Sequence, residues 1–120
     1  PGIGCPVIAS VNGMDLVLVV AEPSGSGISD LKRLCATAAT LQVRLAVCVN
    51  KYDVSPQHTE RIETFCRQQG IAFVGKIPFD PMAVRAVNEG TTVVDIDCPA
   101  GRAVREIFAK LTALLAERSI

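Results

Sequence analysis

Apolar residues fall into short continuous runs along the chain, and each run is followed by a segment with helical spacing. Three runs predict strands over 15–21, 45–49 and 71–74, and a weaker run predicts a short edge strand over 91–95. A continuous apolar run is typical of a strand that is buried on both faces, as in a parallel sheet covered by helices.

The segments between the runs carry apolar residues three or four positions apart. After the first run, these residues share one face of a predicted helix: Leu31, Leu34, Cys35, Ala38 and Leu41. A second helix is predicted from Ser55 to Gly70, because Ser55 can cap its start and Pro56 suits its first turn. Asp80 and Pro81 repeat this pattern before a short helix that ends near residue 90.

The clearest amphipathic pattern lies in the last segment, after a loop predicted over 97–101. One helical face there is expected to be buried: Val104, Ile107, Phe108, Leu111, Leu114 and Leu115. A short helix is also predicted over 5–11, with loops over 1–4 and 22–27, and the strand over 71–74 is followed by Gly75 to Phe79, with a turn at Ile77 and Pro78. Because strands alternate with helices, and crossovers between parallel strands are right-handed, we predict an α/β fold. Its three layers are a parallel sheet with helices on both faces.

Composition narrows the class of protein. The 120 residues are 49% hydrophobic and 20% charged, which excludes disorder and predicts a real core in one domain or in part of a larger one. The formal net charge is zero without a basic cluster, so binding to nucleic acid is not expected. No apolar run approaches the ~18 residues of a membrane span, and no signal segment opens the chain. A cytoplasmic protein is predicted.

The cysteines predict no metal site. They stand at Cys5, Cys35, Cys48, Cys66 and Cys98, an odd number, and no two have the spacing C-x-x-C. Neither a disulfide framework nor a zinc or iron–sulfur site follows from this pattern.

The run over 45–49 ends abruptly in Asn50-Lys51-Tyr52-Asp53. Polar groups just past the carboxyl end of such a strand lie where open α/β sheets bind their ligands. An Asn side chain offers both an acceptor and donors, as reading the edge of a purine base requires. The alternative is structural, with Asn50 capping the strand and Lys51 to Asp53 forming a solvated turn.

Four stretches together resemble one family. Residues 1–10, 20–23, 49–53 and 76–80 follow in the order and spacing of MinD/ParA-type P-loop ATPases. The chain is most similar to the subgroup with an inserted ferredoxin domain, whose members are often described as cobyrinic acid a,c-diamide synthase-like nucleotide-binding proteins. The resemblance implies that residues 1–120 form the carboxyl-terminal half of a single nucleotide-binding domain, without its P-loop.

The resemblance also implies roles for individual residues. Gly2 and Gly4 match the switch II loop, which senses the γ-phosphate and the attacking water. Asn50 matches the residue that reads adenine, with Asp53 beside it, and the backbone around Pro78 lines the base pocket. ATP and Mg²⁺ are implied for the intact protein, and a [4Fe-4S] cluster for the inserted domain.

The P-loop lysine and the Mg²⁺ ligands of the family would precede residue 1. Phosphoryl transfer depends on such charges for most of its catalysis, so this chain by itself is expected to be inactive. The expected partners are a nucleotide and either the missing amino-terminal half or a second copy, in a possible homodimer.

Two other functions are open at this point. Asn50-Lys51-x-Asp53 is also the guanine-reading pattern of GTPase-type domains, in which Asp53 would accept from the guanine edge. The turn at Ile77 and Pro78 favours adenine over guanine. The other alternative is a non-catalytic interaction domain, since an α/β scaffold does not imply a function.

Overall fold

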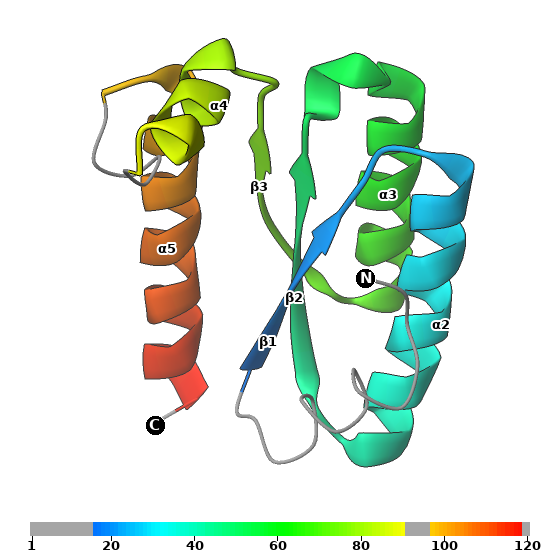
Figure 1. Ribbon diagram of the computed structural model, residues 1–120. Helices are drawn as coiled ribbons and strands as arrows, with labels where there is room; N and C mark the ends of the chain where they lie inside the picture. Colours follow the sequence, from blue (N-terminus) through cyan, green and yellow to red (C-terminus); the bar gives the residue numbers. More distant parts are fainter. Residues whose placement is uncertain (1–15, 91–96, 119–120) are drawn as a thin grey trace.

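Three parallel strands form the centre of the structure, in the order β1–β2–β3 (Figure 1). This computed structural model describes residues 16–90 and 97–118. The strands span Leu16–Ala21 (β1), Arg44–Asn50 (β2) and Ala72–Ile77 (β3). The three main strands predicted from the apolar runs are therefore confirmed.

Helices cover both faces of this sheet, as predicted (Figure 1). Helices α2 (Gly25–Leu41) and α3 (Pro56–Gln69) lie on one face, and α5 (Pro99–Arg118) lies on the other. The short helix α4 (Pro81–Asn88) follows β3 beside the start of α5. Within the described ranges, every helix is too short or too polar to cross a membrane.

Strand β2 is the most buried element of the described chain. Its four central residues are at most 1% exposed. Because side chains of a strand alternate between faces, Val47 and Val49 pack against α2 and α3, in a cluster with Leu31 and Ile62. Ala46 and Cys48 enter a second cluster on the α5 side. The burial of both faces accounts for the uninterrupted apolar sequence of this segment.

Three predicted boundaries are wrong. Helix α2 begins at Gly25, inside the loop predicted over 22–27, since the Ser24 hydroxyl accepts the Gly27 N–H at 3.0 Å. Strand β3 continues past its predicted end at residue 74 as far as Ile77, because its end pairs with β2. Helix α5 begins at Pro99, inside the loop predicted over 97–101.

The predicted buried face of α5 is only partly correct. Ile107 is 4% exposed and Leu111 and Leu114 pack against the sheet, but Phe108 is 71% exposed and Leu115 is 41% exposed. Successive helical residues are about 100° apart, so a helix that meets a sheet through the Ile107 line turns its neighbour Phe108 to the side. The elements predicted over 1–4, 5–11 and 91–95 lie outside the described residues.

A glycine allows α5 to pack closely on β3. The pairing of β2 with β3 shifts by one residue between Val47 and Cys48, so that Cys48 pairs with Gly75. A Cβ at Gly75 would lie 2.6 Å from Cγ1 of Ile107. The bulge in β3 and the absence of a side chain at Gly75 together make room for Ile107, a buried apolar residue of α5.

We expect Gly75→Ala to lower the free energy of unfolding by about 1–3 kcal/mol, because the methyl group overpacks this contact. Chemical denaturation measures the change. In an Ile107→Ala background the same substitution should cost under about 1 kcal/mol, since the opposing atoms are gone. Gly25→Ala is the matched control, as a Cβ there would meet nothing within 4 Å. Equal costs of Gly75→Ala in both backgrounds would contradict this contact.

Strand β1 ends the described sheet, and Val20 is 54% exposed. An uncharged, β-prone strand with an unpaired edge is prone to pair with another chain. We expect the 120-residue chain to self-associate as its concentration rises, and Val20→Lys to reduce this association. Light scattering over a concentration series measures it. Val54→Lys, at a residue 66% exposed but outside the sheet, should leave it unchanged.

Candidate functional site

The candidate site lies where β2 and β3 end. Asn50 is the last residue of β2, and it pairs with Ile77, the last residue of β3. Pro78 follows directly, so Asn50 and Pro78 lie at the same edge of the sheet, as the sequence pattern predicts for two parallel strands. Both residues are half-buried. Gly2 and Gly4 lie outside the described residues.

The chain leaves β2 through an uncommon backbone conformation. Lys51 is in the left-handed region, with a φ of 57°, and it is exposed, so packing of its side chain does not account for this conformation. The turn at Lys51 leads into a single 3₁₀ turn over Tyr52–Val54. It fixes the direction in which the chain departs immediately after Asn50.

The loop after Asn50 is held by contacts from α3 and β3. Thr59 is 4% exposed, and its hydroxyl, which has one hydrogen to donate, lies 3.0 Å from the carbonyl oxygen of Tyr52 and 3.1 Å from that of Ser55. The Nζ of Lys76 lies 5.3 Å from the centre of the Tyr52 ring and 3.3 Å from Oε1 of Glu63. These contacts preorganise the backbone beside Asn50.

Asp53 joins this loop to the turn after β3. Its Oδ1 accepts the backbone N–H of Phe79 at 2.9 Å. The bond connects two segments that are far apart in the sequence, and the pattern of residues contains no signal that predicts it. The structure therefore places Asp53 close to Pro78, through a contact that sequence reasoning missed.

Asp80 holds the other end of the same turn. Its Oδ1 accepts the Met82 N–H at 3.0 Å and so caps α4, as predicted from the sequence. Its Oδ2 accepts the Ala100 N–H at 3.1 Å, in the first turn of α5, which sequence reasoning missed. These two N–H groups, Ala100 first, hold the pKa of the Asp80 carboxyl below its usual value.

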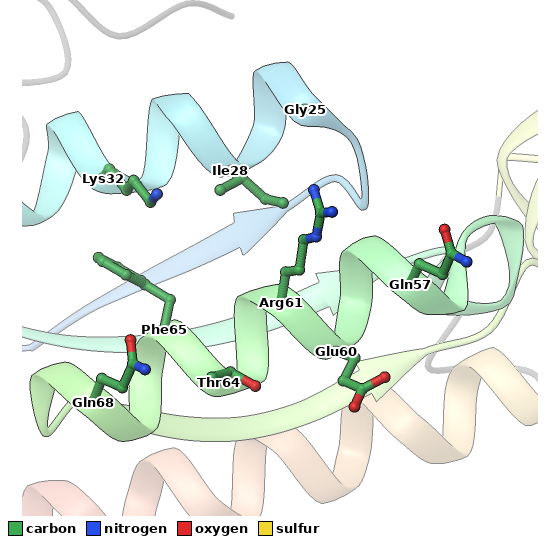
Figure 2. Close-up of a pocket in the computed structure, with 9 residues that line it drawn as sticks. All are labelled: Gly25, Ile28, Lys32, Gln57, Glu60, Arg61, Thr64, Phe65 and Gln68. Atoms are coloured by element: carbon green, nitrogen blue, oxygen red, sulfur yellow. The ribbon is translucent and has the colours of Figure 1, made fainter.

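A separate groove runs between α2 and α3 (Figure 2). Ile28 and Lys32 of α2 and Arg61 and Phe65 of α3 point toward one another across it. The Nζ of Lys32 lies 5.9 Å from the centre of the Phe65 ring. Its lining comes from the two helices alone, so this groove is distinct from the edge that carries Asn50 and Pro78.

The described cysteines do not fit an iron–sulfur cluster. Burial raises the pKa of Cys48 and of Cys66 to about 11, which disfavours the thiolate that metals bind. Cys98 is buried as well, and its sulfur accepts the Gly101 N–H at 3.4 Å. No three potential metal ligands gather anywhere in residues 16–90 and 97–118.

The edge can offer neutral hydrogen-bonding groups to a planar ligand. Within the described part of the chain, the Asn50 side chain makes no hydrogen bond, so its amide can both donate and accept. Pro78 has no N–H, and the Phe79 N–H is already bonded to Asp53. The hydrogen-bonding groups that this part of the turn can offer a ligand are therefore its backbone carbonyl oxygens, which accept. Such a set can match a purine edge, which presents a donor beside an acceptor.

Known proteins support the same fold. No protein-family model matches the chain. An uncharacterized ATP-binding protein of Methanocaldococcus jannaschii is 33% identical, over 92% of this chain and 42% of that protein. An iron-sulfur cluster carrier protein of Pyrococcus furiosus is 28% identical, over 98% of this chain and 44% of that protein. The MinD cell division protein of Aquifex aeolicus superposes with a TM-score of 0.67 at 25% identity, over 82% of this chain and 44% of MinD.

The described chain thus has a MinD-like α/β fold, and its relatives include proteins named for ATP binding and for iron–sulfur cluster carriage. It spans less than half the length of these relatives. The resemblance to MinD/ParA-type proteins is confirmed at this level.

We expect Asp80→Asn to lower the melting temperature at neutral pH, because an amide can accept only one of the two N–H bonds. The folded pKa is depressed, so the carboxylate stabilises the fold above its unfolded pKa of about 3.9. This stabilisation is lost as the pH falls through the folded value. Thermal unfolding from pH 7 to pH 3 should show the two proteins converging in acid. A constant difference would contradict the linkage, and Asp30→Asn serves as an exposed control.

Proposed function

We propose that this chain is the base-binding part of a MinD/ParA-like nucleotide-binding domain, and that the intact protein binds ATP. The observation that carries the proposal is the placement of Asn50 beside the Ile77–Pro78 turn at the carboxyl edge of β2 and β3. Ligands of open α/β sheets bind at this edge. Asn50, Asp53 and Pro78 are the proposed residues of the base site.

The remaining parts of the domain are proposed from the resemblance and the relatives. The chain would be the carboxyl-terminal half, with the P-loop and the Mg²⁺ ligands in the part that precedes it. Gly2 and Gly4 would belong to the switch II loop. In the intact protein, ATP hydrolysis would then switch its conformation or its dimerisation.

The finer subgroup is also a proposal. The four sequence stretches resemble those of the ferredoxin-insert, cobyrinic acid a,c-diamide synthase-like proteins, in which the cluster would be [4Fe-4S], and relatives named iron-sulfur cluster carrier proteins support a link to an iron–sulfur cluster. The cluster would be bound by the inserted domain, since no three potential metal ligands gather among the described residues of this chain. We propose a cytoplasmic protein that acts as a homodimer.

A GTPase-type domain is the second candidate, because Asn50-Lys51-x-Asp53 matches the guanine-reading pattern. The two candidates differ in the base that the site selects. They also differ from an interaction domain, which would bind neither nucleotide. Titration of the intact protein with ATP and with GTP separates the three functions.

We expect Asn50→Ala in the intact protein to weaken ATP binding about 10- to 30-fold, because two hydrogen bonds of about 1 kcal/mol each are lost. Calorimetric titration measures the affinity. Asn88→Ala, at the exposed end of α4, is the matched control and should bind as the unaltered protein does. Unchanged ATP affinity of Asn50→Ala would show that Asn50 does not bind the base. A preference of the intact protein for GTP would favour the GTPase-type domain.

A further inference from the structure

Asp53 has a carboxylate at the proposed base site, but the structure gives this carboxylate a partner within the protein. Its Oδ1 lies 2.9 Å from the backbone nitrogen of Phe79. Because Pro78 has no N–H, Phe79 supplies the first backbone donor after β3. Beyond the ends of the strands, this hydrogen bond connects the loop after Asn50 with the turn that contains Pro78.

Both sides of this connection are anchored. On the loop side, the Thr59 hydroxyl lies within hydrogen-bonding distance of the Tyr52 and Ser55 carbonyl oxygens, and Lys76 lies against the Tyr52 ring. On the turn side, Asp80 directly follows Phe79 and bonds to the first turns of α4 and α5. A bond between two anchored segments sets their separation, which a bond between two loose loops would not do.

The same bond restricts what Asp53 can read. A carboxylate that recognises guanine accepts from two adjacent N–H groups on the base edge, one with each oxygen. Here Oδ1 is already turned to a backbone N–H. Oδ1 has a second lone pair and can accept another N–H, but the Phe79 bond fixes the orientation of the carboxylate, so guanine could be read only if its edge met the carboxylate in that orientation. An adenine edge has no such pair of adjacent donors and makes no demand on Asp53.

We infer that Asp53 is a positioning residue that sets the spacing between Asn50 and Pro78, and that it thereby selects adenine over guanine. The selection rests on the proposed nucleotide-binding function, whereas the positioning contact does not. Asp53 thus has a role different from that of the base-reading Asp in the guanine pattern.

The positioning contact is tested without any nucleotide. Amide hydrogen exchange at Phe79 is measured in the intact protein and in Asp53→Ala, Asp53→Asn and the control Asp30→Asn. Exchange should accelerate about three- to tenfold in Asp53→Ala, the factor expected when one net hydrogen bond is lost. It should change little in Asp53→Asn, because the amide oxygen can accept the same N–H. Unchanged exchange in Asp53→Ala would overturn the inference.

The selection is tested with ATP, GTP and xanthosine triphosphate, whose base has a carbonyl in place of the guanine amino group. We expect Asp53→Ala to weaken ATP binding about three- to tenfold through the loss of preorganisation. Asp53→Asn should bind ATP with the affinity of the unaltered protein, because its amide oxygen can still accept the Phe79 N–H. Asp30→Asn should bind ATP with unchanged affinity. If the uncharged amide of Asp53→Asn supports normal ATP affinity, Asp53 acts by positioning the turn and not through its negative charge.

A base-reading Asp53 gives the opposite pattern. The intact protein would prefer GTP, and Asp53→Asn would transfer that preference to xanthosine triphosphate, because the amide donates where the carboxylate accepts. That result overturns the inference, as does an Asp53→Asn protein that binds ATP as poorly as Asp53→Ala. If no variant binds any nucleotide, the proposed function and the selection fail together, while the exchange at Phe79 still decides whether Asp53 positions the turn.

Discussion

The rest of the structure depends on the burial of β2 on both of its faces. A buried strand must satisfy its backbone N–H and C=O groups with neighbouring strands, so β1 and β3 flank it. Its side chains alternate between two cores, so helices must cover both faces. Polar chemistry can then begin only where the strand ends, at Asn50. The position of the candidate site is in this sense a consequence of the core.

The existence of the elements could be predicted from sequence, because a continuous apolar run is typical of a buried strand and helical spacing is typical of a half-buried helix. Their boundaries could not, since pairing and caps decide them. Gly75 and Lys76 resemble loop residues, yet both pair with β2 and belong to β3. Phe108 fits the apolar face of α5, yet it is exposed because the sheet contacts the line through Ile107 instead. The spacing of apolar residues predicts a helix, but it does not determine which side of the helix contacts the sheet.

The candidate site likewise has features that could be predicted from the sequence and features that could not. Asn50 and Pro78 could be placed together from sequence, because each follows a strand and parallel strands end at one edge. The bonds from Asp53 to Phe79 and from Asp80 to Ala100 could not, because backbone N–H groups are present at every residue except proline and leave no trace in the sequence. The sequence identifies Asp80 only as the cap of the helix directly after it. Its second bond depends on where α5 begins in space.

The charges at this edge of the sheet support a separation between base recognition and phosphate binding. The carboxylates of Asp53 and Asp80 face backbone N–H groups, and Lys76 is engaged by Glu63 and the Tyr52 ring. A polyphosphate needs cations or helix N-termini directed at it, whereas a purine base is neutral and needs hydrogen bonds in a fixed arrangement. The contacts described at this edge supply a fixed arrangement, and the exposed Lys51 adds one cation beside Asn50. If the proposed function holds, this chain would contribute selectivity to nucleotide binding, and groups that contact the phosphates would supply most of the binding energy.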